Sequence, residues 1–351
     1  MEEIRVILAD VGVSSRAVMQ RPEIVSPLAT RLSHRPVVEA RAVPGYDPIF
    51  NAGLLVHEGT YHLFARGVRD GYQPNPGDGP KFLDYVSDIL VFESTDGVNY
   101  SFAYVLAASG KDGDHAFEDP RVQVVRSNGV SKVVMTYTNL PPAWTGLPWR
   151  IGVHRLLYAD GRFHLDGESA RVIGPEGIGN KDAVVFNLID GRVALMHRIH
   201  PNIQVAVFDS LDAMWHADPT YWNDHLAHLD HHTILSPSPG ALSVGAGAPP
   251  VPTPDGLLLF FHERRGDGSY TINAALLDAA TARVVAKLPD PLLEPELEWE
   301  RAGDVENVVF VQGAHRREDG TIYLTYGAAD RCVGAATVPE DQLLAALLNV
   351  G

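Results

Sequence analysis

The sequence predicts an all-β fold, on the basis of three observations. Glycine and proline are abundant, at 32 and 25 of 351 residues, which is typical of many turns between short elements. Short apolar or alternating runs are separated by turn pairs such as Asp-Gly and Asn-Gly, the usual pattern of β-hairpins. These hairpins also recur at a nearly constant distance along the chain.

Five hairpins follow one another along the chain. Their turn pairs are Glu58-Gly59, Asn128-Gly129, Asp190-Gly191, Asp255-Gly256 and Asp319-Gly320. A short polar or glycine-rich segment precedes each hairpin, and these segments recur every 62 to 67 residues, at Asn51, Glu118, Lys181, Gly245 and Asn307. A further strand-like run follows each hairpin, at 89–94, 151–157, 204–210, 272–278 and 333–337. This repeat is typical of a propeller blade and predicts a five-bladed β-propeller, whereas two β-sandwiches would not repeat so regularly.

The end of the chain is the one clear helical prediction. Residues Pro339–Leu348 form an amphipathic segment, which we expect to be a short C-terminal helix. No low-complexity linker interrupts the sequence, so we expect residues 1–351 to be a single domain.

Composition excludes several classes of partner. Lys plus Arg is 28 and Asp plus Glu is 44, so the net charge of −16 argues against nucleic acid. The single cysteine, Cys332, cannot form an intrachain disulfide and is expected to be a buried strand residue. Neither a signal-peptide pattern nor an apolar run of membrane-spanning length is present. We expect a cytoplasmic protein without a membrane partner. Whether the chain forms a homo-oligomer stays open.

The repeated segments contain most of the unusual charged residues. In a propeller the innermost strands surround a central funnel, so these segments should converge there. The predicted funnel residues are Asn51, Arg66, Asp119, Arg121, Lys181, Asp182, Arg198, His262 and Asp330. Such a set is too polar for a core, because unpaired buried charges are costly. We therefore expect a polar ligand site carrying both signs of charge.

Asp119 is the candidate acid of this funnel. Pro120 should push Asp119 towards an extended backbone. Adjacent strand residues point to opposite faces, so one of Glu118 and Asp119 should face the channel while the other braces the scaffold. A turn-forming Asp-Pro that is ion-paired to Arg121 is the alternative.

The cations of the funnel favour an anion site. Lys181 and Arg198 lie on one hairpin, and with Arg150 and His262 they could hold phosphate. Ordinary exposed charges are the alternative. Three chemistries stay open at this point: acid-assisted glycosyl transfer, metal binding by His and Asp, and ligand binding without reaction.

A histidine-rich stretch falls between two blades. Its members are His225, His228, His231 and His232, and their spacing is compatible with a metal site on a helix. Because the stretch lies outside the predicted funnel, a short solvated helix at a blade junction is favoured, with no metal.

Several motifs resemble, in order, those of glycoside hydrolase family 130, the β-mannoside phosphorylases and mannosidases. They are Phe50–Gly53, Glu118–Arg121, Asn180–Asp182, Met196–Arg198, Gly245–Pro250, Leu292–Asn307 and Tyr326–Asp330. The resemblance extends from about residue 45 to 338 and implies a five-bladed propeller. It also implies an inverting cleavage of a terminal β-mannosidic bond in a mannose-containing oligosaccharide. Inorganic phosphate attacks the anomeric carbon, so the product is α-mannose 1-phosphate and no cofactor is needed.

The resemblance also implies individual roles. Asp119 is then the general acid, and its proton reaches the leaving oxygen through the 3-hydroxyl of the mannose. The implied substrate-binding residues are Asn51, Arg66, Asp182 and Asp330. The implied phosphate-binding residues are Lys181, Arg198, His262 and, less directly, Arg150.

Three positions depart from the family pattern. Phe64 and Ala65 precede Arg66 where a Tyr-Arg pair is common, Ile199 follows the His-Arg pair where proline is usual, and Glu263 follows His262 where glycine is usual. A carboxylate at Glu263 would repel phosphate and supply a base for water, so an inverting β-mannosidase is the alternative. A non-catalytic carbohydrate-binding propeller is the third possibility. Linkage and acceptor stay unassigned.

Overall fold

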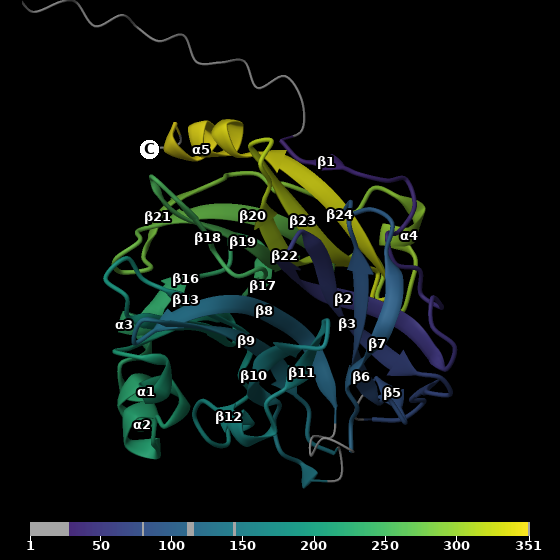
Figure 1. Cartoon of the computed structure of the whole chain (residues 1–351), viewed down its shortest axis with the longest axis horizontal. Helices are drawn as coiled ribbons and strands as arrows, with labels where there is room; N and C mark the ends of the chain where they lie inside the picture. Colours follow the sequence, from purple (N-terminus) through teal and green to yellow (C-terminus); the bar gives the residue numbers. More distant parts are fainter. Residues whose placement is uncertain (1–27, 79–80, 111–115, 143–144, 350–351) are drawn as a thin grey trace, which may run out of the picture.

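The computed structural model describes residues 28–78, 81–110, 116–142 and 145–349. Five antiparallel sheets stand around a common axis, and a short helix follows the last of them (Figure 1). The predicted five-bladed β-propeller with a C-terminal helix is therefore confirmed.

Blades 1 and 2 follow the predicted order, with the innermost strand first. Blade 1 consists of β2 (Tyr46–His57), β3 (Thr60–Arg69), β6 (Ser87–Ser94) and β7 (Ser101–Ala107), with a small hairpin of β4 (Gln73–Pro74) and β5 (Phe82–Leu83) inserted before β6. Blade 2 consists of β8 (Phe117–Ser127), β9 (Val130–Asn139), β10 (Arg150–Ala159) and β11 (Arg162–Leu165), with β12 (Arg171–Ile173) also paired to β10 and a single 3-10 turn at Gly167–Ser169.

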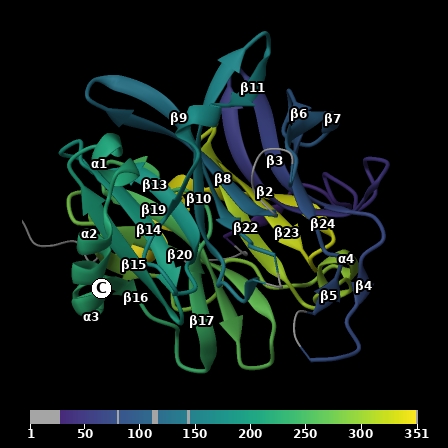
Figure 2. The ribbon, with the colours of Figure 1, turned by 90° about the horizontal axis from the view of Figure 1, so that it is seen from below.

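Blade 3 carries the largest helical insertion among the described residues. Its strands are β13 (Lys181–Asn187), β14 (Val193–Ile199), β15 (Asn202–Phe208) and β16 (Thr233–Leu235). Helices α1 (Leu211–Trp215), α2 (Pro219–Ala227) and α3 (Leu229–His232) join β15 to β16 and lie at the periphery of the molecule (Figures 1 and 2). The predicted helix in the histidine-rich stretch therefore belongs to blade 3 itself.

Blades 4 and 5 complete the ring. Blade 4 consists of β17 (Ala241–Ala246), β19 (Gly256–Arg265), β20 (Tyr270–Leu277) and β21 (Val284–Lys287), and β18 (Val251–Thr253) also pairs with β19. The predicted hairpin at Asp255-Gly256 thus joins β18, rather than the innermost strand, to β19. Pro249 and Pro250 separate β17 from β18, because proline has no N–H for the ladder.

Blade 5 consists of β22 (Val309–Arg316), β23 (Thr321–Ala328), β24 (Cys332–Pro339) and β1 (Thr30–Arg31), with α4 (Glu298–Arg301) before it and α5 (Glu340–Leu348) after it.

The apolar core lies between neighbouring blades, because successive strand residues face opposite sides. On β19, Phe261 packs with Met196 of blade 3, whereas Phe260 packs with Val311 of blade 5. Cys332 is 3% exposed at the start of β24, which confirms its prediction as a buried strand residue.

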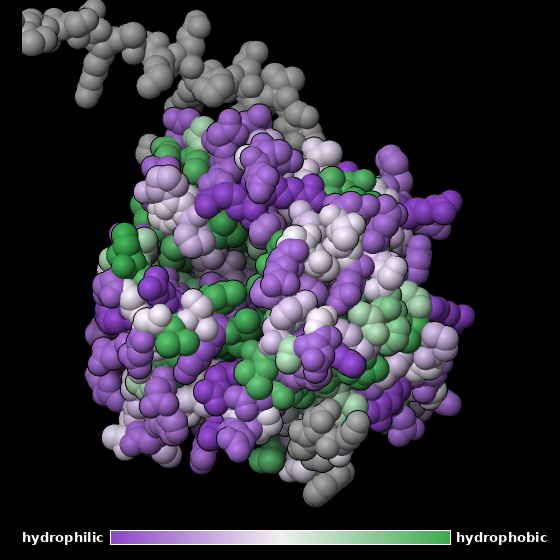
Figure 3. Space-filling model, viewed as in Figure 1, coloured by the Kyte–Doolittle hydropathy of each residue, from purple (hydrophilic) through white to green (hydrophobic). Residues whose placement is uncertain are grey.

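The outer surface is mostly hydrophilic on the face seen in Figure 3, with apolar residues gathered around a hollow near its middle. None of the described helices is long and apolar enough to cross a membrane.

Closure of the ring depends on a strand from the opposite end of the chain. Strand β1 pairs with β24, so blade 5 combines residues near both termini. The Arg31 guanidinium on β1 donates to both carboxylate oxygens of Glu300 at 2.7 and 2.9 Å, and Tyr326 donates to the same carboxylate at 2.8 Å. Glu300 is fully buried, so this ion pair anchors the closing strand.

Replacing Arg31 should weaken closure. Arg31→Ala leaves the Glu300 carboxylate buried without its cation, so the free energy of unfolding should fall by about 3–5 kcal/mol. Arg192→Ala is the matched control, because the pair of Arg192 and Asp190 is exposed and should contribute less than about 1 kcal/mol. Urea denaturation measures both. Equal losses in the two variants would contradict the anchoring role.

Candidate active site

The innermost strands of three blades share one backbone irregularity, a left-handed residue at a register shift. Asn51, Asp119 and Asp182 have φ values of 46°, 52° and 53°, in the left-handed region that Asn and Asp tolerate better than most residues. Each lies at a register shift in its strand pairing, at β2, β8 and β13 respectively. A bulge of this kind redirects a side chain. Three blades therefore present their polar residue at equivalent positions.

Asp119 is held by two neighbours from blade 1. Asn51 Nδ2 donates to Asp119 Oδ1 at 2.8 Å, and Arg66 Nη1 donates to the same oxygen at 3.2 Å. The other terminal nitrogen of Arg66 pairs with Glu118. The three predicted residues Asn51, Arg66 and Asp119 are thus brought together.

The predicted conformation of the acid was wrong. Asp119 is left-handed rather than extended, and both Glu118 and Asp119 bond to one guanidinium instead of facing opposite sides. The bulge between Glu118 and Arg121 explains the difference, because it interrupts the alternation of a regular strand.

Aromatic rings sit over the Arg66 guanidinium. The centres of the Phe50 and Tyr85 rings lie 4.8 and 5.2 Å from its central carbon. Cation–π contact of this kind limits where the guanidinium can move. Tyr85 was not predicted in the site, because it follows β5 in a segment without a recognisable motif.

Arg121 connects three blades from the centre of the molecule. Its side chain is 1% exposed and donates to the carbonyl oxygens of Asp119, Ala246 and Gly247, each at 2.9 Å. The guanidinium also donates to Asp182 Oδ1, at 3.3 Å. Blades 2, 3 and 4 therefore share one buried cation. Gln312 of blade 5 adds a similar link, donating to the carbonyls of Asn51 and Pro120, and sequence reasoning missed it.

Asp182 contacts two of the predicted anion-binding residues. Its Oδ2 lies 3.1 Å from Arg198 Nη1 and 3.5 Å from His262 Nε2. Lys181 pairs directly with Arg198 across β13 and β14. Asp182 is 1% exposed, so in this structure its carboxylate orders neighbouring cations. Gly245 permits the approach, because a Cβ there would lie 2.4 Å from both Asp182 Oδ2 and His262 Nε2.

Two predicted residues lie outside this cluster. Arg150 donates to the carbonyl of Gly174 at 2.6 Å. Glu263 accepts from Ser238 Oγ at 2.8 Å and from Lys287 Nζ at 3.2 Å, on the face of β19 opposite His262. Among the described residues, neither side chain bonds to Lys181, Arg198 or His262.

The histidine-rich stretch is solvated only in part, because His228 and His231 are exposed as predicted but His225 is buried. His225 is 2% exposed, and its Nε2 lies 3.1 Å from Nε2 of His197, whose Nδ1 lies 3.1 Å from Oδ1 of Asn180. Burial lowers the pKa of His225 to about 4, so the ring is neutral near pH 7. No cluster of three or more His, Cys, Asp or Glu residues suited to a metal occurs in the described parts of the chain. His225 instead packs α2 against β14 through its contact with His197.

The carboxyl groups of the site have different proton affinities. Burial would raise the pKa of Asp119, but Arg66, Lys181 and Arg121 outweigh it and hold that pKa below its usual value. Burial raises the pKa of Asp330 to about 7, with Arg66 opposing and Asp119 adding to the rise. Divergent carboxyl pKa values of this kind are typical of acid–base sites. His262 has its pKa lowered to about 4 by burial, so it is neutral near pH 7.

The raised pKa of Asp330 should appear in the stability of the protein. Between about pH 4 and 7 the folded chain retains a proton on Asp330 that the unfolded chain has lost, so the free energy of unfolding should fall as pH rises through this window. Asp330→Asn should therefore be more stable than the parent by about 2 kcal/mol at pH 8, with a smaller difference at pH 4.

Urea denaturation of both proteins at the two pH values measures this effect. Asn tolerates the left-handed φ of 52° at this position, so the backbone is preserved. Asp160→Asn, at an exposed turn residue with φ 53°, controls for the substitution itself. A pH-independent difference between Asp330→Asn and the parent would contradict the assignment.

The chain is similar to several known proteins over most of its length. The family model of glycoside hydrolase family 130, described as beta-1,4-mannooligosaccharide phosphorylase, matches residues 14–348. A 1,2-beta-oligomannan phosphorylase from Thermoanaerobacter sp. (strain X514) is 31% identical over 315 residues, covering 87% of this chain and 95% of the relative. A beta-1,2-mannobiose phosphorylase from the same organism is 29% identical over 320 residues, covering 90% and 98%.

A solved structure has the same fold. The beta-1,2-mannobiose phosphorylase of Listeria innocua, in complex with beta-1,2-mannobiose, superposes with a TM-score of 0.72 at 20% identity. The match covers 92% of this chain and 99% of the other. With a family model spanning nearly its whole length and a relative above 30% identity, the chain belongs to glycoside hydrolase family 130.

Proposed function

We propose that this family 130 enzyme is an inverting β-mannoside phosphorylase, which cleaves a terminal β-mannosidic bond with inorganic phosphate and releases α-mannose 1-phosphate. The proposal depends most on one observation: the Asp182 carboxylate orders Arg198 and His262 beside Lys181, while Arg121 connects this cluster to Asp119. A cationic cluster for the nucleophile and a carboxyl for the leaving group are the parts that phosphorolysis requires. The names of the two curated relatives, both phosphorylases of β-1,2-mannosides, support the proposal and favour the β-1,2 linkage.

The phosphate would bind at Lys181, Arg198 and His262. A guanidinium has five N–H donors, so Arg198 can pair with Asp182 and still donate to a phosphate oxygen. His262 is neutral near pH 7 and can donate one hydrogen bond. Arg150 has the weakest support, because its side chain bonds to Gly174. No cofactor is part of this proposal.

The sugar would bind between Asn51, Arg66 and Asp330, above the Asp119 carboxyl. In the reaction, a phosphate oxygen forms a bond to the anomeric carbon as the bond from that carbon to the leaving oxygen breaks. The leaving oxygen takes a proton that originates on Asp119, through the 3-hydroxyl of the mannose as the family resemblance implies. Asp330 has a pKa of about 7, so it can exchange hydrogen bonds with sugar hydroxyls in either protonation state.

Phosphate binding would favour the protonated form of Asp119, which is the form that can act as the acid. Positive charges hold the pKa of Asp119 down, so the carboxyl is ionised when the anion site is empty. A phosphate beside Lys181 would offset part of that positive charge and raise the pKa of Asp119. Proton uptake by the acid would therefore accompany binding of the nucleophile.

Hydrolysis is the second candidate, because Glu263 adjoins His262 in the sequence. Its carboxylate is engaged by Ser238 and Lys287, an arrangement that supports a structural role. A non-catalytic sugar-binding propeller has less support, since that role would leave the proton affinities of Asp119 and Asp330 unused. A cytoplasmic location also belongs to the proposal, in line with a chain that has one cysteine.

Removing the acid should abolish phosphate-dependent cleavage. The parent enzyme should convert β-1,2-mannobiose to α-mannose 1-phosphate and mannose only when phosphate is present. Asp119→Asn should lower kcat by roughly 10²–10⁴-fold, the usual contribution of general acid catalysis. Asparagine tolerates the left-handed φ of 52°, so the melting temperature should change little. NMR product analysis with and without phosphate decides the result, and release of free mannose without phosphate would reject phosphorolysis in favour of hydrolysis.

Glu263 should be dispensable for the reaction. Glutamine keeps an oxygen acceptor for Ser238, so Glu263→Gln should retain kcat of phosphorolysis within about twofold. Glu294→Gln, which removes a carboxylate from the exposed pair with Arg265, is the matched control. An inactive Glu263→Gln enzyme with a normal melting temperature would restore Glu263 as the base of a hydrolase.

A further inference from the structure

A chain of three buried polar side chains extends from helix α2 to the residue before Lys181. Asn180, His197 and His225 are each at most 2% exposed. His197 Nδ1 lies 3.1 Å from Asn180 Oδ1, and His197 Nε2 lies 3.1 Å from His225 Nε2. Apolar side chains of similar shape would fill such a space at little cost, so a buried polar chain indicates a need for its hydrogen bonds. The proposed reaction uses none of these three side chains.

The contacts fix the position of the hydrogen on each ring. Burial lowers the pKa of His197 and of His225, so both rings are neutral near pH 7 and each has one N–H. Asn180 Oδ1 can only accept, so His197 donates through Nδ1. His197 Nε2 is then an acceptor, and His225 donates to it through Nε2. His225 Nδ1 has no hydrogen-bond partner among the described residues, so the ring loses no donor contact in this form.

Helix α2 holds the donating ring against β14. Trp222 and His225 are three residues apart on one face of the helix. The centres of their rings lie 5.9 and 5.0 Å from the centre of the His197 ring. The His232 ring of α3 stacks on His225, with 4.0 Å between centres. The helical insertion of blade 3 therefore presents one ring nitrogen to His197 in a fixed orientation.

Asn180 ends an irregular connection that leads to Lys181. Residues 174–180 join β12 to β13 without a helix or strand of their own, so individual contacts determine where Lys181 begins its strand. The Asn180 backbone N–H donates to the carbonyl of Trp149 at 3.1 Å, and Lys181 Nζ lies 5.6 Å from the centre of the Trp149 ring. Asn180 therefore fixes the backbone from which Lys181 projects.

Gly174 covers another part of the Asn180 amide. A Cβ at Gly174 would lie 2.9 Å from Asn180 Nδ2, and its φ of 100° favours glycine. Arg150 holds this turn by donating to the Gly174 carbonyl at 2.6 Å. The sequence predicted Arg150 as a phosphate-binding residue, but in this structure it contacts the support of Asn180.

The bond between Asn180 and His197 lies directly beside the cation pair. Asn180 precedes Lys181 on the way into β13, His197 precedes Arg198 on β14, and the strand register pairs Lys181 with Arg198. The regular ladder is interrupted between Lys181 and Val184. The side-chain bond therefore connects the two strands next to an irregular part of their pairing, at the point where the cations project.

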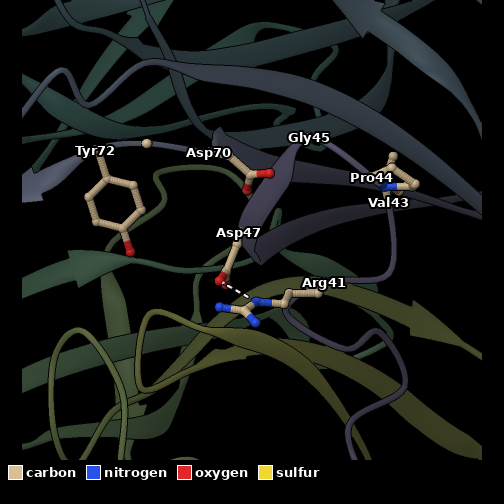
Figure 4. Close-up of a pocket in the computed structure, with 8 residues that line it drawn as sticks. Arg41, Val43, Pro44, Gly45, Asp47, Asp70 and Tyr72 are labelled. Carbon is tan, nitrogen blue, oxygen red and sulfur yellow. Dashed lines mark hydrogen bonds and ion pairs between the residues drawn. The ribbon is translucent and has the colours of Figure 1, made fainter.

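The chain lies on the nucleophile side of the funnel. It supports blade 3 beside Lys181 and Arg198, whereas the cavity that contains the Arg41–Asp47 ion pair lies at the entry to blade 1, across the ring (Figure 4). Blade 1 also supplies Asn51 to the proposed sugar site. A change in the chain should therefore affect phosphate more than sugar.

We propose that His225, through His197 and Asn180, positions Lys181 and Arg198 for phosphate, so that the helical insertion of blade 3 determines the affinity for the nucleophile. The inference rests on the proposed function, because it takes these two cations to be part of the phosphate site. The two histidines and Asn180 are positioning residues, since their buried side chains act through the cations.

Two substitutions of His225 separate positioning from packing. His225→Gln keeps an N–H donor, whereas His225→Phe keeps a ring without a donor. In His225→Phe the KM for phosphate should rise about tenfold, because His197 loses the donor that holds its own hydrogen on Nδ1. In His225→Gln it should stay within about threefold of the parent, and the KM for β-1,2-mannobiose should change less than about twofold in both variants.

The same two exchanges at His231 are the matched controls. His231 lies in the same histidine-rich stretch, on α3, but is exposed, so both of its variants should keep the parental KM for phosphate. Equal rises in the KM for phosphate in His225→Gln and His225→Phe would indicate packing alone and overturn the proposal. A rise for mannobiose as large as that for phosphate would also overturn it.

NMR of the parent protein tests the chain independently of turnover and of any variant's folding. Spectra of protein with isotope-labelled histidine report which nitrogen of each neutral ring carries hydrogen. We expect Nδ1 for His197 and Nε2 for His225. The reverse assignment would contradict the proposed direction of donation.

Calorimetric titration with inorganic phosphate separates failure of this inference from failure of the proposed function. A parent that binds phosphate but releases mannose without it would reject phosphorolysis. The phosphate Kd of His225→Phe, compared with that of His225→Gln, would still decide the positioning role. A parent that binds no phosphate would overturn the inference directly.

Discussion

The buried Arg121 guanidinium is the constraint on which the rest of the site depends. A fully buried cation is costly unless its donors are satisfied, and here two carbonyls of blade 4, the carbonyl of Asp119 and the Asp182 carboxylate supply the partners. These partners belong to three blades, so their relative positions are fixed by one side chain. The acid and the cation cluster share this support, and neither can shift without disturbing the other.

The site is built from irregular backbone on a regular scaffold. Five sheets repeat one pattern, and the innermost strands of three of them depart from it at Asn51, Asp119 and Asp182. Small residues allow the strands to approach there. A Cβ on Gly53 would lie 2.4 Å from the carbonyl oxygen of Pro120, so blades 1 and 2 meet only with glycine at this position. Close packing at the axis therefore brings side chains from different blades within bonding distance.

Sequence patterns predicted the propeller well, because turn chemistry and strand alternation are local properties that repeat five times. They also placed Asn51, Asp119 and Lys181 on innermost strands, and Arg66, Arg198 and His262 on the strands that pair with them, which is where the structure has them. The sequence patterns failed where contacts between residues far apart in the sequence determine the local structure. The bulge at Asp119 overrode strand alternation, His225 on α2 is buried against His197 of β14, and Tyr85 reaches Arg66 from a segment with no motif of its own. The engagement of Glu263 by Lys287 likewise depends on pairing that its sequence neighbours do not reveal.

Local charge, rather than net charge, determines which ligand the funnel can attract. The chain carries −16 overall, yet four cations near the axis, Lys181, Arg198, Arg121 and Arg66, face the three carboxylates of Glu118, Asp119 and Asp182. With neutral His262, this group keeps a positive excess in a site of low exposure, where charges interact strongly. An incoming dianion would neutralise that excess and thereby make protonation of Asp119 easier. In the absence of phosphate the same electrostatic coupling would keep Asp119 ionised, because water brings no negative charge to raise its pKa, and an ionised carboxylate cannot act as the acid. In this way a propeller with a negative net charge would protonate Asp119 mainly when phosphate is bound.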